Sequence, residues 1–250
     1  MKPTFLEYEK PLLTVMVQAK TPERIKELID KSLPEGAEAY GMQFEKMLPE
    51  YRTPETYREL FAYAPGKPVY ATNYRKAQNA GKSDEVLANE LLELAENGAT
   101  LCDMMGDYFD PQPGELTRDE TAVKKQMQLI DELHKKGAEV LMSSHVLKFI
   151  PAEEVLSIAL EHEKRGVDIC KIVTGADTME QQIENMRITN LLKENLKIPF
   201  LFLANGECHI FRRVAGNLGN CMSLCVQEYD EFSTNTQPLL KNMKASRENM

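Results

Sequence analysis

The chain has no long hydrophobic run and little positive charge. No apolar stretch approaches the roughly 20 residues that a membrane-spanning helix requires, so we expect no membrane association. The opening residues MKPTFLEYEKP lack the apolar core of a signal peptide, which favours a cytoplasmic protein. Lys and Arg total 30 against 39 Asp and Glu, a net charge of −9. This balance argues against nucleic acid as a partner and means that any anion site is built locally from a few basic residues.

Cysteine and histidine are also scarce. The five cysteines are an odd number, and most lie in or beside apolar runs, so we expect reduced, buried thiols rather than a disulfide framework. Of the four histidines, His134 and His162 lie in charged segments with helical spacing, and only His145 follows a strand-like run. With one well-placed histidine, a metal site is not expected.

What the chain does contain is a repeated pattern of short, β-rich apolar runs separated by segments with helical spacing. The runs begin 22 to 39 residues apart, and start signals such as Thr21-Pro22-Glu23 and Ser83-Asp84-Glu85 precede the helical segments. Eight strand–helix units in 250 residues predict a TIM (β/α)8 barrel in one domain, residues 1–250. The runs are Leu12–Val17, Ala39–Phe44, Pro68–Asn73, Thr100–Met105, Glu139–His145, Ile169–Thr174, Phe200–Asn205 and Met222–Val226.

Lys171 stands inside the sixth run, Ile169-Cys170-Lys171-Ile172-Val173. A buried ammonium is costly to desolvate unless it is paired or its pKa falls until the amine is neutral. A neutral amine can attack a carbonyl and form an imine. Ser143 and His145 share a face of the neighbouring strand, because side chains alternate along a strand. His145 and Lys171 can therefore converge at the C-terminal mouth of the barrel, where catalytic groups lie in this fold.

Four segments then identify a family. LMSSHVLKFIPAEEVLSIAL, followed by VDICKIVT, resembles the histidine and lysine segments of type I 3-dehydroquinate dehydratases. FRRVAGNLGN resembles the arginine-bearing segment of that family, and FSTNTQ resembles its closing loop. The resemblance implies a Schiff-base mechanism without metal or nucleotide cofactor. Lys171 would condense with the ketone of 3-dehydroquinate, and His145 would remove the adjacent proton and assist departure of the β-hydroxyl. It also implies a homodimer.

The same resemblance implies a set of substrate-binding residues. Arg213 matches the arginine that holds the substrate carboxylate, whereas Arg212 is offset by one and is expected to face away. Arg75 matches the arginine after the third strand, and Ser233 and Gln237 match substrate contacts of the closing loop. A guanidinium can bind a carboxylate through two parallel hydrogen bonds, which makes arginine a better carboxylate ligand than lysine.

Three positions depart from the family pattern. Its Glu-x-Arg on the second strand becomes Gly41 and Gln43, and the glutamate that orients the catalytic histidine becomes Met105. Glu45 or Asp107 could replace the missing carboxylate only through an insertion or deletion. Without such a replacement, we expect the histidine to have a lowered pKa and a looser orientation. Gln43 would then meet the substrate where the family recognises ring hydroxyls, and Met105 would add apolar volume to the substrate site where a charge is expected.

Three functions are therefore compared. The first is a lyase that eliminates water from a carboxylated β-hydroxy ketone, either 3-dehydroquinate or a relative that differs in its hydroxyls. The second is a non-catalytic barrel that binds a keto acid or a protein partner, which the loss of the glutamate would favour. The third is a metal-dependent isomerase that uses Asp103, Asp107, His145 and Glu115.

Overall fold

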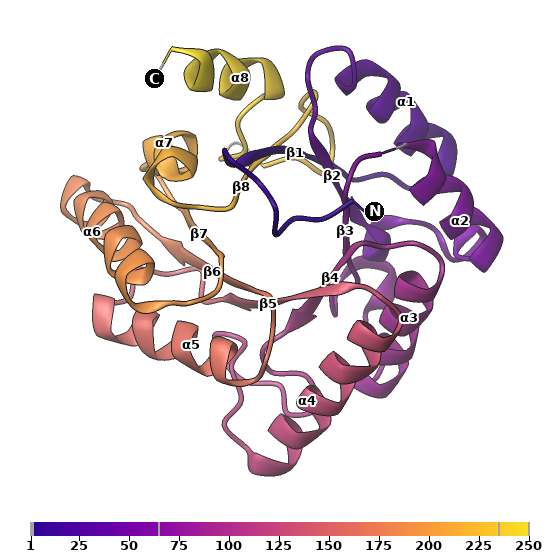
Figure 1. The fold of residues 1–250 in the computed structure, drawn as a ribbon, viewed down its shortest axis with the longest axis horizontal. Coiled ribbons are helices and arrows are strands. Elements are labelled where there is room, and N and C mark those ends of the chain that lie inside the picture. The colour runs from indigo at the N-terminus through magenta and orange to yellow at the C-terminus, as the bar shows by residue number, and fades with distance from the viewer. Residues whose placement is uncertain (1–2, 65, 235, 250) are drawn as a thin grey trace.

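The computed structural model describes residues 3–64, 66–234 and 236–249. Within these ranges, parallel strands form one sheet in the order β7-β6-β5-β4-β3-β2-β1-β8, and helices lie outside it (Figure 1). The strands are β1 Leu12–Val17, β2 Ala39–Gln43, β3 Val69–Thr72, β4 Leu101–Met105, β5 Glu139–His145, β6 Ile169–Gly175, β7 Phe200–Asn205 and β8 Met222–Cys225. The α-helices are α1 Pro22–Ser32, α2 Pro54–Tyr63, α3 Asp84–Glu96, α4 Glu120–Lys135, α5 Ala152–Lys164, α6 Met179–Asn195, α7 Ile210–Leu218 and α8 Leu240–Glu248. Three 3₁₀ turns follow β2 and β3: η1 Phe44–Lys46, η2 Pro49–Tyr51 and η3 Ala77–Asn79.

The predicted TIM barrel is confirmed, and each predicted apolar run contains one strand. β1, β5 and β7 have the predicted bounds, and the other strands differ by a residue at one or both ends. Phe44 begins a 3₁₀ turn instead of ending β2, since its carbonyl accepts a hydrogen bond from the amide of Met47. The predicted helix starts are also confirmed, because the side chains of Thr21 and Ser83 cap α1 and α3.

The barrel closes unevenly. β1 pairs with both β2 and β8, but no ladder joins β7 to β8 among the described residues. Instead, the buried side chain of Asn220 accepts a hydrogen bond from the amide of Phe202 (2.9 Å) and donates one to its carbonyl (2.8 Å). The amide of Cys221 also donates to the carbonyl of Phe200 (2.9 Å). One side-chain amide thus takes the place of a strand partner at this seam.

The N-terminal end of the barrel is filled by apolar side chains. The N-terminal segment crosses this end of the ring in Figure 1, and Phe5 is fully buried there. Phe5 packs in one cluster with barrel residues such as Leu101, Leu141, Ile169 and Leu201. Its amide donates to the carboxylate of Glu139 (3.0 Å). Because this end is filled, a cavity inside the barrel can open only toward the C-terminal ends of the strands.

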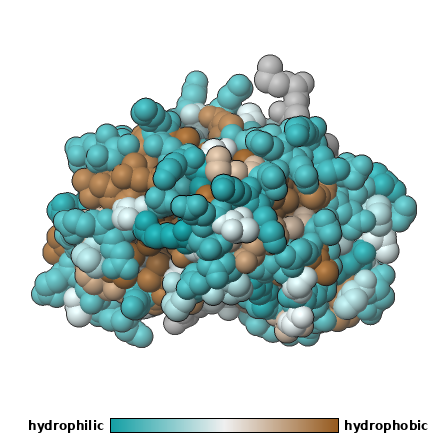
Figure 2. Space-filling view, turned by 90° about the horizontal axis from the view of Figure 1, so that it is seen from below, coloured by the Kyte–Doolittle hydropathy of each residue, from teal (hydrophilic) through white to brown (hydrophobic). Residues whose placement is uncertain are grey.

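The outer surface is mostly hydrophilic on the face shown in Figure 2, with scattered apolar patches. None of the helices in the described ranges combines the length and apolar character that crossing a bilayer demands. All five cysteines are free thiols, as predicted, and all but Cys208 are buried.

Candidate active site

A cavity of about 700 Å³ opens at the C-terminal ends of the strands. Every strand, or the segment directly after it, contributes at least one side chain to its wall. Six of the eight predicted site residues lie in this wall, and Arg213 and Ser233 do not. The six are Gln43, Arg75, Met105, His145, Lys171 and Gln237.

Lys171 points across the barrel from β6 toward β3 and β4. Its side chain is nearly buried, and Nζ donates hydrogen bonds to Tyr74 Oη (2.6 Å), Tyr70 Oη (2.9 Å) and Asp103 Oδ2 (3.0 Å). Of the two ways to accommodate a buried lysine, the structure shows pairing with a carboxylate. The resting side chain is therefore held as one half of an ion pair with Asp103.

Asp103 is the centre of this cluster and is 1% exposed. Besides Lys171, it accepts hydrogen bonds from Ser143 Oγ (2.5 Å) and from the phenols of Tyr70 and Tyr74. Burial alone would raise the pKa of Asp103, but the charge of Lys171 and these hydrogen bonds hold it below its usual value. Burial and the nearby carboxylate raise the pKa of both tyrosines well above 10. The cluster therefore holds a carboxylate and two neutral phenols.

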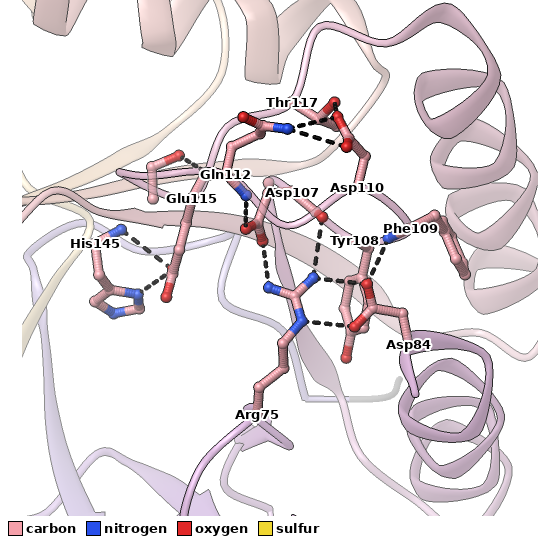
Figure 3. A network of polar contacts seen from close by, with 12 residues as sticks. Arg75, Asp84, Asp107, Tyr108, Phe109, Asp110, Gln112, Glu115, Thr117 and His145 are labelled. Atoms are coloured by element: carbon pink, nitrogen blue, oxygen red, sulfur yellow. Dashed lines mark hydrogen bonds and ion pairs between the residues drawn. The ribbon is translucent and has the colours of Figure 1, made fainter. Parts of the chain in front are cut away.

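His145 ends β5, beside Lys171. Its Nδ1 lies 2.6 Å from Glu115 Oε2, and its amide donates to the same oxygen at 3.2 Å (Figure 3). A carboxylate can only accept, so Nδ1 carries the proton and Nε2 is the basic nitrogen. Burial and the charge of Lys171 lower the pKa of His145 below 6.5, although Glu115 opposes the shift. His145 is thus a neutral, oriented base near pH 7.

Glu115 was not predicted as the partner of His145. The two suggested replacements for the family glutamate are wrong. Glu45 is buried and accepts a hydrogen bond from Thr72 Oγ1 (2.8 Å), and Asp107 pairs with Arg75 (2.7 Å). Glu115 comes instead from the loop between β4 and α4. The expected loosening of the histidine is therefore corrected, since a carboxylate from another segment orients it.

The backbone around Glu115 is fixed from several sides. Glu115 has a φ of 54°, a left-handed conformation that costs a non-glycine residue about 1–2 kcal/mol. Its carbonyl accepts a hydrogen bond from Ser144 Oγ (2.7 Å). The buried guanidinium of Arg165 donates to the carbonyls of Gly106 (2.8 Å) and Thr117 (2.6 Å), at the two ends of the loop. These contacts hold a strained loop in the position that brings its carboxylate to His145.

Replacing Glu115 by glutamine should lower the pKa of His145 further, because the carboxylate that opposes the effect of burial is removed. The measurement is an NMR titration of the His145 ring in the wild type and in Glu115→Gln. Glu154→Gln is the control, because Glu154 is exposed and lies outside the cavity wall. An unchanged or higher pKa in Glu115→Gln would show that Glu115 does not tune this histidine.

Arg75 lies in the cavity wall as predicted, but two carboxylates already engage it (Figure 3). Nε and Nη2 contact Asp84 at 2.6 and 2.8 Å, and Nη1 contacts Asp107 at 2.7 Å. Burial alone would lower the pKa of Arg75, but these contacts with the two carboxylates raise it above its ordinary value. The guanidinium therefore connects the segment after β3 to the loop after β4. Fewer of its N–H donors are left for a substrate anion.

The positions of Arg212 and Arg213 are the reverse of the prediction. Arg212 lines the cavity, where it donates to Ala204 O (3.0 Å) and Asn205 Oδ1 (2.6 Å). Arg213 lies in an outer crevice beside Pro11 and donates to the carbonyl of His209 (2.7 Å). Neighbouring residues on a helix point about 100° apart, so only one of the two can face the barrel.

The environment of Arg212 is that of an anion site. Its side chain is partly buried, and desolvation lowers its pKa to about 10. Within the part of the chain that the structure describes, no carboxylate lies within ion-pair distance of it. A partly desolvated guanidinium that donates only to a carbonyl and an amide oxygen would be stabilised by a bound anion.

The loop after β8 contributes Gln237 and Thr234 to the cavity, but not Ser233. Ser233 Oγ instead accepts from the amide of Asp230 (2.7 Å) and donates to its carbonyl (3.0 Å). The predicted substrate contact of Ser233 is therefore corrected, because its hydroxyl closes a turn within the loop. Gln237 Oε1 accepts from the amide of Thr234 (2.8 Å).

The wall formed by β1, β2 and β4 is less polar than the family pattern. Gln43 and Met105 line it as predicted, and Met16 lies beside Gly41. A Cβ placed on Gly41 would lie 2.4 Å from Met16 Sδ, so the methionine occupies the space of a side chain at position 41. An apolar thioether thus stands where the family carries a glutamate.

The ligands of the suggested metal site are engaged elsewhere. Asp103 pairs with Lys171, Asp107 with Arg75, and Glu115 with His145. Across residues 3–64, 66–234 and 236–249, no group of three or more His, Cys, Asp or Glu side chains could hold a metal ion.

Comparison with curated proteins supports the resemblance seen in the sequence. The chain is 37% identical over 92 residues to the 3-dehydroquinate dehydratase of Alkaliphilus oremlandii, which is 36% of each chain. It is 25% identical over 154 residues to that of Lactiplantibacillus plantarum, covering 60% of this chain and 59% of the relative. The matched region therefore spans about a third to three fifths of the length of these relatives.

Solved structures show the same fold. The 3-dehydroquinate dehydratase of Geobacillus kaustophilus has a TM-score of 0.82 at 13% identity and covers 96% of this chain and 91% of its own. The type I enzyme of Clostridium difficile, solved with covalently modified comenic acid, has a TM-score of 0.80 at 16% identity, covering 100% and 98%. Residues 14–244 match the family described as type I 3-dehydroquinase. That match covers most of the sequence, so the chain belongs to the type I 3-dehydroquinase family.

Proposed function

We propose that this chain is a Schiff-base-forming dehydratase that eliminates water from a carboxylated β-hydroxy ketone, either 3-dehydroquinate or a close analogue. The observation that carries the proposal is the presence of Lys171, His145 and Arg212 in the wall of one cavity. These residues supply a nucleophile, a base and an anion ligand, which are the groups that such a reaction requires. The relatives named above are 3-dehydroquinate dehydratases, a hydro-lyase activity that fits this set.

The reaction follows from the roles of two side chains. The Lys171 amine adds to the ketone, and loss of water gives an iminium, which withdraws electrons from the neighbouring carbon. His145 Nε2 removes a proton from that carbon and forms an enamine. The enamine electrons then expel the β-hydroxyl, which takes a proton from His145 and leaves as water. Hydrolysis of the conjugated iminium returns Lys171 and releases the enone, 3-dehydroshikimate if the substrate is 3-dehydroquinate.

Arg212 is the proposed ligand of the substrate carboxylate. A carboxylate bound there would pair with this partly desolvated guanidinium and hold the ketone in the cavity that contains Lys171. Binding energy used in this way places the carbonyl near the amine and the α-proton near the histidine.

A pair of neighbouring substitutions tests this assignment. Arg212→Lys should raise KM for 3-dehydroquinate about 10- to 100-fold, because it loses roughly 1.5–3 kcal/mol of charge-assisted hydrogen bonding. Arg213→Lys makes the same change one residue away, outside the cavity, and should leave KM within about twofold, the spread of ordinary surface substitutions. Steady-state kinetics of both variants decide the matter. A larger KM effect from Arg213→Lys would restore the original prediction.

The direct test of the function is turnover of 3-dehydroquinate, followed by the absorbance of the conjugated enone. Borohydride added during turnover should reduce the iminium and leave a mass increment on Lys171. An adduct without enone formation would favour the binding function or an analogue with different hydroxyls, which the apolar wall at Met16 and Met105 also favours. No adduct with 3-dehydroquinate or other keto acids would contradict the proposal. Homodimer formation, which rests on the family resemblance, and a cytoplasmic location, which is expected from the sequence, belong to the same proposal.

A further inference from the structure

Two tyrosines contact both members of the Lys171–Asp103 ion pair. Tyr74 Oη lies 2.6 Å from Lys171 Nζ, Tyr70 Oη lies 2.9 Å from it, and both phenols donate to Asp103 Oδ2. The two hydroxyls are 3.3 Å apart. Tyr70 lies within the short strand β3 and Tyr74 follows it, which places both rings on the side of the barrel opposite Lys171.

Only one of the two tyrosines reaches the place where chemistry would occur. Tyr74 lines the cavity, and its ring meets the ring of His145 edge-on with centroids 5.2 Å apart. Tyr70 is 0% exposed and lies outside the cavity wall, in the apolar cluster inside the barrel. The hydroxyl of Tyr74 is therefore next to the space for the substrate, whereas the hydroxyl of Tyr70 is separated from it.

Formation of an imine from a paired lysine requires movement of two protons. The resting ammonium carries three protons, and the iminium nitrogen keeps one. The other two must reach the carbonyl oxygen so that it can leave as water. Groups that already contact Nζ can carry these protons without any rearrangement of the site. His145 is already engaged by Glu115 on one nitrogen, and its other nitrogen is needed for the α-proton.

We propose that Tyr74 and Asp103 relay these two protons from Lys171 to the departing carbonyl oxygen, which makes Tyr74 a catalytic residue that the family pattern does not include. This inference rests on the proposed Schiff-base function. Tyr74 suits the task because its hydroxyl contacts the reacting nitrogen and also lines the space that the carbonyl would enter. Asp103 suits it because it accepts from both Lys171 and Tyr74.

The steps balance without any other reactant. Asp103 takes the first proton from the ammonium, and the neutral amine adds to the carbonyl carbon, whose π electrons move to oxygen. The phenol of Tyr74 protonates that oxygen and regains its proton from Asp103, which gives a carbinolamine with a protonated nitrogen. That nitrogen passes its second proton to Asp103, and Tyr74 delivers it to the hydroxyl in the same way. The C–O bond then breaks, water leaves, and the nitrogen lone pair forms the iminium. Asp103 ends as a carboxylate and Tyr74 as a phenol.

The charge balance of the cluster supports this path. The ammonium and the iminium each carry one positive charge, so Asp103 has a cation beside it before and after the reaction. Burial and Asp103 keep Tyr74 in its neutral form at rest, which is the form that can donate. Hydrolysis of the product iminium runs through the same groups in reverse.

The two tyrosines provide a matched comparison. Tyr74→Phe and Tyr70→Phe each remove one hydroxyl that contacts both Lys171 and Asp103. The wild type and both variants are mixed with 3-dehydroquinate in a single turnover, quenched with borohydride at increasing times, and analysed for mass on Lys171. Tyr74→Phe should slow adduct formation about 100-fold or more, the scale of a lost proton-transfer group. Tyr70→Phe should slow it no more than about fivefold, as expected for one lost hydrogen bond near 1 kcal/mol.

A second readout separates a relay from a structural role. A group that only transfers protons accelerates formation and hydrolysis of the imine equally, so the fraction of enzyme trapped at long times should be the same in Tyr74→Phe and Tyr70→Phe. Equal slowing in the two variants would overturn the relay. The relay would also be overturned if the fraction trapped at long times in Tyr74→Phe fell by the same factor as its rate of adduct formation. If the wild type itself forms no adduct, the Schiff-base function fails and the relay fails with it. If adduct forms in Tyr74→Phe at the wild-type rate, the relay alone is overturned.

Discussion

Replacement of Lys171 by methionine should abolish both turnover and the borohydride-stable adduct. Methionine has a similar length but no nucleophile, so the covalent path is lost, and the rate should fall roughly 10⁴-fold or more, as when a catalytic nucleophile is removed elsewhere. The measurements are enone formation from 3-dehydroquinate and the mass of the borohydride-treated protein. An adduct that persisted in Lys171→Met would place the nucleophile at another lysine.

The same substitution has a second effect that must be separated from the first. Asp103 is 1% exposed and pairs with Lys171, so Lys171→Met leaves a buried carboxylate without its cation. Loss of one partner of a buried ion pair costs about 3–5 kcal/mol of unfolding free energy. The double variant Lys171→Met/Asp103→Asn removes both charges and should recover most of that loss. If the double variant is folded and stable by thermal denaturation, its inactivity reports chemistry and not unfolding.

Replacement of His145 by glutamine should separate imine formation from elimination. Lys171 and its partners remain, so the adduct with 3-dehydroquinate should still form. Removal of the α-proton should slow about 10²- to 10⁴-fold, because the general base is lost. The adduct trapped by borohydride should therefore carry the mass of the uneliminated substrate, whereas wild-type adduct should include the dehydrated form. Loss of the adduct itself in His145→Gln would show that the histidine also acts in imine formation.

The pH dependence of the wild type should agree with this role. A base works in its unprotonated form, so kcat/KM falls as pH drops through the pKa of His145 in the free enzyme. Burial and the charge of Lys171 place this pKa below 6.5, so activity should stay constant to a pH below that value. The acidic limb should disappear from the residual activity of His145→Gln. A limb that remained unchanged would belong to another group.

The sequence was sufficient to predict the barrel and the placement of His145 and Lys171 at its mouth, because both depend on short-range patterns. Runs of apolar residues at regular intervals define the strands, and alternation along β5 and β6 brings His145 and Lys171 to one cavity. The register confirms this geometry, since Ser143 lies opposite Lys171 and His145 opposite Val173.

The missed residues depend on details that a pattern does not contain. Arg213 was predicted to face the cavity, but Arg212 does. Neighbouring residues on a helix point about 100° apart, so a shift of one residue reverses which of the two faces the cavity. Glu115 reaches His145 only because its loop takes a left-handed turn, and nothing in the spacing of β4 and α4 indicates that turn. Tyr74 meets Lys171 across the barrel, a contact between residues 97 positions apart. Long-range contacts of this kind appear only once the barrel is closed.

The contact between Gly41 and Met16 constrains how this cavity can evolve. A new side chain at position 41 would collide with the Met16 sulfur, which comes from the neighbouring strand. The two positions share one space, so the Met16 side chain must shift before any side chain fits at position 41. A shorter residue at position 16 would free that space, but on its own it would leave a hole in the wall of the cavity.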